Sequence, residues 1–104
     1  METSEIILDK IKHAVHEITP EAKVILFGSR ATGNTHEESD WDILVLTKEK
    51  HAKKTKWEIH NKLYPIALHN DTFIHLTFTN EDEWENGAAY YSLKMNVANE
   101  MIVL

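Results

Sequence analysis

Two short apolar runs enclose the polar segment from Gly28 to Asp42, and they constrain most strongly how this chain can fold. The first run is Val24–Phe27 and the second is Ile43–Leu46. Runs of this length, bounded by glycine or by charged residues, indicate buried β-strands. The second run is apolar at every position, so we expect its sheet to be covered on both faces or the strand to lie centrally in the sheet. One strand therefore delivers Gly28 to a polar loop, and the next strand begins at Asp40.

The groups at the two ends of this loop suit a phosphate and a cation. Gly28 lets the backbone turn tightly, and the N–H groups that follow it, with the Ser29 hydroxyl, can bind a phosphate oxygen. Asp40 and Asp42 alternate along a strand, so both carboxylates lie on one face and Trp41 lies on the other. Because carboxylates this close repel each other, a divalent cation is the common partner. The pattern indicates phosphoryl chemistry; the alternative is a polar turn with two solvated aspartates.

These residues resemble the signature of the nucleotidyltransferases related to DNA polymerase β, in which Gly-Ser is followed by a ten-residue spacer and Asp-x-Asp. Ser29 and Asp40-Trp41-Asp42 fit that pattern. The chain is similar to the minimal nucleotidyltransferases, which consist of the catalytic domain alone. The resemblance implies the polymerase β-like fold, with Mg²⁺ held by Asp40 and Asp42. It also implies that a nucleoside triphosphate, with ATP the expected one, binds at Gly28 and Ser29. Arg30 could reach a phosphate too, or it could face solvent or pair with Glu37 or Glu38.

The chain departs from that family at the third carboxylate, which active members usually carry on the next long strand. The matching position here is His75. A neutral imidazole could act as the catalytic base, because its unperturbed pKa is near physiological pH. It is a poor ligand for Mg²⁺, which prefers oxygen. His75 is therefore either a base or a strand histidine without a chemical role, and Asp71 and Glu58 are the spare carboxylates nearby in the sequence.

Minimal nucleotidyltransferases are commonly paired with a small helical HEPN-type protein, an RNase toxin. The resemblance implies that the transferase acts as the antitoxin by moving a nucleotidyl group, typically adenylyl, onto a hydroxyl of that partner. We keep one alternative open, which is a catalytically impaired antitoxin that binds a nucleotide or its partner protein and acts by complex formation alone.

The remaining patterns predict one domain over residues 1–104 with an α/β (α+β) fold, in which helices pack against a small mixed sheet. Helices are expected from Thr3 or Ser4 to Ile18, over about 51–64 with Pro65 at its end, and from Asn80 through Gly87 to Tyr91. A helical turn is expected at 29–32, a loop at 35–39 and a third strand at 72–79. The apolar tail 101–104 should either join the sheet or meet a partner chain.

Composition excludes several classes of function. The formal net charge is −6 at pH 7, whereas binding to nucleic-acid phosphates needs clustered lysine and arginine. The only basic cluster, at 48–56, is either a solvated segment or a segment that attracts a triphosphate or an acidic protein surface. Direct binding to nucleic acid is therefore not expected. The chain has no cysteine, which excludes disulfides and zinc–thiolate sites.

Location and assembly are constrained less strongly. No apolar run is long enough to cross a membrane, and the first residues lack the pattern of a signal peptide. We therefore expect a cytoplasmic protein. Its small size and apolar tail would fit a homodimer or a complex with a different chain.

Overall fold

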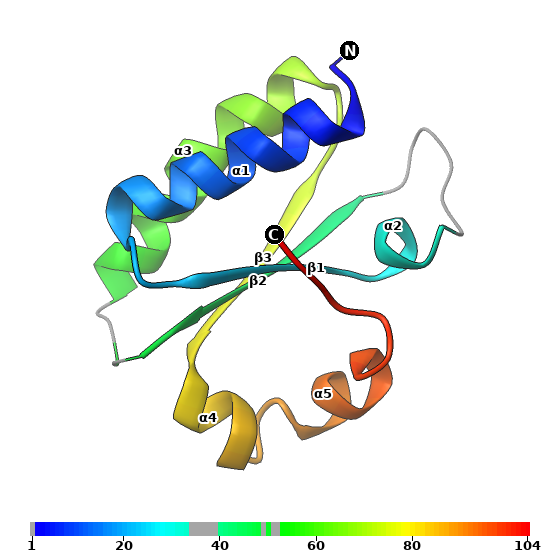
Figure 1. The fold of residues 1–104 in the computed structure, drawn as a ribbon. Coiled ribbons are helices and arrows are strands. Elements are labelled where there is room, and N and C mark those ends of the chain that lie inside the picture. The colour runs from blue at the N-terminus through cyan, green and yellow to red at the C-terminus, as the bar shows by residue number, and fades with distance from the viewer. Residues whose placement is uncertain (1, 34–39, 49, 51–52) are drawn as a thin grey trace.

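The computed structural model describes residues 2–33, 40–48, 50 and 53–104. Its elements are α1 (Ser4–Ile18), β1 (Lys23–Phe27), α2 (Ser29–Thr32), β2 (Trp41–Thr47), α3 (Lys53–His69), β3 (Ile74–Asn80), α4 (Glu81–Asn86), α5 (Tyr91–Val97) and β4 (Ile102–Val103). The strands form one sheet in the order β3-β2-β1-β4 (Figure 1). β2 and β3 are parallel, whereas β1 is antiparallel to both of its neighbours. This mixed sheet with packed helices confirms the expected fold class.

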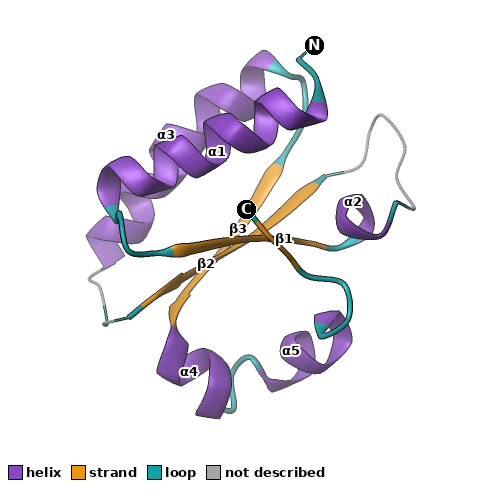
Figure 2. Cartoon of the chain, in the orientation of Figure 1, coloured by secondary structure: helices purple, strands orange, loops and turns teal. Residues whose placement is uncertain are grey.

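Helices cover both faces of the sheet, as the apolar β2 run predicts. α1 and α3 lie together on one face, and α4 and α5 lie on the other (Figure 2). Alternate strand side chains supply the two cores. The first core contains Val24, Leu26, Trp41, Ile43 and Val45 with residues of α1 and α3. The second contains Ile25, Phe27, Leu44 and Leu46 with Trp84 and Val97.

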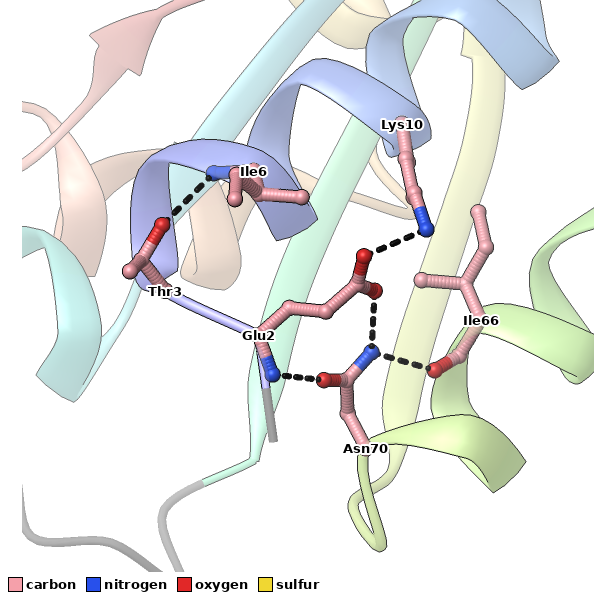
Figure 3. Close-up of polar contacts among 6 residues, drawn as sticks. All are labelled: Glu2, Thr3, Ile6, Lys10, Ile66 and Asn70. Atoms are coloured by element: carbon pink, nitrogen blue, oxygen red, sulfur yellow. Dashed lines mark hydrogen bonds and ion pairs between the residues drawn. The ribbon is translucent and has the colours of Figure 1, made fainter.

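A buried asparagine joins the start of α1 to the end of α3. The Asn70 side chain is 1% exposed. Its Oδ1 accepts the Glu2 N–H at 2.8 Å, and its Nδ2 donates to the Ile66 carbonyl at 2.9 Å and to Glu2 Oε1 at 3.1 Å (Figure 3). Lys10 pairs with the same Glu2 carboxylate. Because Asn70 closes α3, this network fixes where the chain turns toward β3.

The first helix begins and ends where its sequence predicts. The Thr3 hydroxyl accepts the Ile6 N–H at the N-terminus of α1, as expected of a capping threonine. Buried Ile7, Ile11 and Val15 follow at helical spacing. The expected helical turn at 29–32 is α2, and the apolar tail does join the sheet, as β4 against β1. The expected loop at 35–39 lies outside the described residues.

Two expected helix boundaries are wrong. α3 continues through Pro65 to His69. Proline removes one helical hydrogen bond there, but Leu63 and Ala67 on either side of it are buried, and packing of an apolar face outweighs a single lost bond.

The helix after β3 also differs from expectation, because it ends at Asn86 and a separate helix, α5, begins at Tyr91. Gly87 ends α4 because its backbone is extended, with φ −80° and ψ 149°, while its N–H still donates to the Glu83 carbonyl at 2.9 Å. A Cβ at Gly87 would lie 2.5 Å from that oxygen, so the close approach needs glycine. Within the described part of the chain, no helix has both the length and the apolar character to cross a membrane.

Candidate active site

The candidate site lies where β1 ends, β2 begins and the first residues of β3 run beside them. In the sheet register, Phe27 pairs with Asp42, and Asp42 pairs with His75. Gly28, which directly follows Phe27, is therefore next to Asp42 on one side, and His75 is next to it on the other. The structure thus brings Gly28, Asp42 and His75 together although they are far apart in the sequence.

Gly28 and the Asp42 carboxylate are in close contact. Gly28 has φ +77°, and a Cβ built on it would lie 2.3 Å from Asp42 Oδ2. Glycine is favoured here because this backbone conformation strains any other residue, and a Cβ would also force the Asp42 carboxylate to move. The chain then enters α2, whose first residue is the half-buried Ser29. Asp42 therefore sits against the backbone turn that the sequence predicts for phosphate binding.

His75 contacts Asp40, the other aspartate of the pair. Its Nε2 lies 2.9 Å from Asp40 Oδ2, and the two side chains are 62% and 43% exposed. Contact with Asp40 fixes one ring nitrogen, so the other, Nδ1, is the one that could accept a proton. Strand register and this hydrogen bond place His75 beside both aspartates.

The electrostatics of the pair favour a cation. Partial burial raises the pKa of Asp42; His75 opposes this shift when it is protonated, while the charge of Asp40 adds to it. A carboxylate that is desolvated beside a second carboxylate gains from a positively charged partner. In the described part of the chain, no three histidine, aspartate or glutamate side chains form a metal-binding group. Mg²⁺ commonly takes one or two carboxylates and completes its shell with substrate phosphates and water, and the aspartate pair fits that mode of binding.

Arg30 lies on the opposite face of β2 from Asp42 but close enough to Asp40 for the two charges to interact. Its guanidinium is stacked over the Trp41 ring, with 4.0 Å from Cζ to the ring centroid. Trp41 packs in the core under α1 and α3, on the opposite face of β2 from Asp42. Burial lowers the pKa of Arg30, and the charge of Asp40 opposes that shift. Sequence reasoning missed Trp41 as the platform for this arginine, since a buried aromatic residue in a strand gives no sign of a cation stacked on it.

The spare carboxylates occupy other positions. Glu58 lies on α3, where its Oε1 is 4.0 Å from Lys54 Nζ. Asp71 has φ +49° in the turn between α3 and β3. Neither residue belongs to the strands that carry Asp42 and His75.

Comparison with known proteins finds a matching domain family and a related protein. A model of the nucleotidyltransferase domain family matches residues 8–104. A protein of Methanocaldococcus jannaschii, whose name proposes protein adenylyltransferase activity, is 44% identical over 52 residues, which are 50% of this chain and 52% of that protein. The match therefore spans about half the length of that relative.

Two solved structures are similar over most of this chain. One is a toxin–antitoxin complex with AMP-PNP, with a TM-score of 0.66 and 26% identity over 91% of this chain and 69% of the matched chain. The other is a variant of the toxin–antitoxin complex MntA–HpeT, with a TM-score of 0.67 and 26% identity over 99% of this chain and 72% of the matched chain.

Proposed function

The chain belongs to the nucleotidyltransferase domain family, and from this premise we propose that it transfers a nucleotidyl group, with adenylyl the expected one, from a nucleoside triphosphate to a hydroxyl of a partner protein. The observation that carries the proposal is the contact of Gly28 with Asp42 beside the Asp40–His75 pair. It joins a backbone turn suited to a phosphate with two carboxylates suited to a cation.

The aspartates would bind the metal ion, and the turn after β1 would bind the triphosphate. Asp40 and Asp42 would hold Mg²⁺, which when bound neutralises phosphate charge in the reaction. One oxygen of Asp40 is engaged by His75, which leaves its other oxygen for the metal. The backbone after Gly28 and the Ser29 hydroxyl would orient the triphosphate, and Arg30 could approach its outer phosphates. The acceptor oxygen bonds to the α-phosphorus in line with the departing pyrophosphate, and positioning supplies most of the acceleration.

His75 would take the place of the missing carboxylate as base. With Nε2–H donated to Asp40, its Nδ1 can accept the proton of the attacking hydroxyl. The aspartate contact favours the imidazole orientation that this role needs, in the way that an acidic partner orients other catalytic histidines.

The proposed partner is a HEPN-type toxin, with this chain as its antitoxin. Both solved relatives at 26% identity are toxin–antitoxin complexes, and one of them contains AMP-PNP. The name of the curated relative supports adenylyl transfer to a protein. The second candidate function, inhibition of the partner by binding alone, is favoured by His75 standing where active relatives carry a carboxylate.

One experiment separates the two functions. The chain is incubated with ATP, Mg²⁺ and the product of the adjacent gene, and the mass of that product is followed. We expect a one-nucleotide increase that is lost in Asp40→Asn, in Asp42→Asn and in EDTA. Asp9→Asn, an exposed aspartate on α1, is the matched control and should retain transfer. A tight complex without any mass increase would instead establish the binding function.

A further inference from the structure

An apolar groove runs along α3 and the outer edge of β3. It consists of two adjacent cavities of about 400 and 550 Å³, and both are lined by His60 and Ile74. Four large apolar side chains in its walls are 59–70% exposed: Trp57, Tyr64, Leu68 and Phe73. Large apolar side chains gathered in one exposed place are typical of a site that binds another protein.

The edge of β3 is open along this groove. β3 is the outermost strand on its side of the sheet, and within the described residues no strand pairs with its outer edge. The Phe73 carbonyl accepts the Trp41 N–H at 2.9 Å and so points toward β2. Since main-chain groups alternate in direction along a strand, those of Ile74 and Leu76 point outward. Outward groups of this kind are a template for an added strand.

The groove also reaches the candidate site from the side opposite the phosphate turn. His75, which contacts Asp40, lines the larger cavity. β2 lies between β1 and β3, so Gly28 and the groove are on opposite sides of Asp42. The acceptor and the triphosphate would therefore approach the aspartate pair from different strands, the acceptor from the β3 side and the triphosphate from the β1 side.

Charge indicates what kind of segment fits. Lys53 and Lys56 lie at the end of the groove that contains Trp57, and both are exposed. These lysines stand out in a chain of net charge −6, which otherwise repels acidic partners.

We infer that this groove binds an extended segment of the acceptor protein, one that adds as a strand to the edge of β3. Its apolar side chains occupy the two cavities, its acidic side chains face Lys53 and Lys56, and its hydroxyl is delivered past His75 to the aspartate pair. The inference rests on the proposed function and specifies the acceptor side of that site.

The test uses the full chain and the product of the adjacent gene as probe. The Trp57→Ala, Phe73→Ala double variant should raise the acceptor KM and the Kd of the complex at least tenfold, while the Kd for ATP stays unchanged. Lys53→Glu, Lys56→Glu should act in the same direction. The matched control is Tyr91→Ala, Met95→Ala, which removes two side chains of similar exposure from α5 and should behave as the unaltered chain.

Hydrogen exchange tests strand addition directly. The amides of Ile74 and Leu76 should exchange at least tenfold more slowly in the complex than in the unbound chain. Groove variants that bind as the control does, unprotected amides in a formed complex, or absence of any complex would each overturn the inference. A complex that forms through the groove without nucleotide transfer would overturn the proposed function but support the docking site.

Discussion

Gly28 shows at the scale of a single residue how a backbone conformation and a carboxylate depend on each other. Its φ of +77° and ψ of −159° lie in a region that is essentially restricted to glycine. Replacing it by alanine adds both backbone strain and a collision with Asp42 Oδ2. We expect Gly28→Ala to lower the free energy of unfolding by about 2–3 kcal/mol and to abolish transfer.

Gly33 provides the matched control for that substitution. It also has positive φ, at +81°, but a Cβ there would meet nothing within 4 Å. Gly33→Ala should therefore cost only about 1 kcal/mol, from conformation alone, and retain transfer. Urea denaturation and the mass assay measure both effects. Equal losses of unfolding free energy and of transfer in the two variants would show that the contact with Asp42 contributes to neither.

Replacing Asp42 by asparagine should stabilise the folded chain in a pH-dependent way. Burial raises its pKa in the folded chain, so its charged form disfavours folding. This cost is absent below the unfolded pKa of about 3.9 and grows as the pH rises through the folded pKa. Asp42→Asn should therefore raise the free energy of unfolding at pH 7, by no more than about 1 kcal/mol because solvent screens a partly exposed charge, and have no such effect at pH 3.

Asp40→Asn is the comparison for that measurement, because it breaks an exposed pair with His75. Such pairs contribute about 0–1 kcal/mol, so this variant should show no gain at pH 7. Denaturation of both variants at the two pH values decides the matter, and a loss of stability in Asp42→Asn at pH 7 would contradict the electrostatic account.

Asn70 matters at the scale of the elements, because it connects α1 and α3 at the turn that leads to β3 (Figure 3). Asn70→Ala leaves the Glu2 N–H without its partner in a half-buried place, and we expect a loss of about 1–3 kcal/mol in the free energy of unfolding. Asn86→Ala removes an exposed hydrogen bond to Asp82 and should change it by no more than about 0.5 kcal/mol. Thermal denaturation of the two variants provides the comparison, and equal melting temperatures would show that the network is not structural.

Elements with a strong local signal could be predicted from the sequence, and those decided by packing could not. α1 has a capping threonine and an apolar stripe, and both are readable as local patterns. Pro65 predicts a helix end, but α3 continues beyond it because Leu63 and Ala67 are buried. The two-residue strand β4 has no periodicity of its own, and only its pairing with β1 makes it a strand. At the site, the spacing of Ser29 and the aspartates was readable, whereas the His75–Asp40 contact depends on the β2–β3 register.

At the scale of the whole molecule, the site is formed by tertiary structure rather than by any one segment. The groups that would bind the triphosphate follow β1, the carboxylates lie at the start of β2, and the imidazole comes from β3. The order of these strands could not be predicted from the sequence, because it depends on which strand edges pair. A ligand that bridges groups from different strands binds the folded chain alone and must stabilise it.

This linkage gives a prediction for the unmodified chain. At ten times its Kd, ATP with Mg²⁺ should add about 1.4 kcal/mol to the free energy of unfolding, which for a domain of this size raises Tm by about 6–11 °C. EDTA should remove most of the shift, because without the cation the triphosphate meets two carboxylates. The Asp40→Asn, Asp42→Asn double variant should show no dependence on Mg²⁺, and Asp9→Asn should match the unaltered chain. An ATP-induced shift of equal size with and without Mg²⁺ would mean that the nucleotide binds somewhere other than between the Gly28 turn and the aspartate pair.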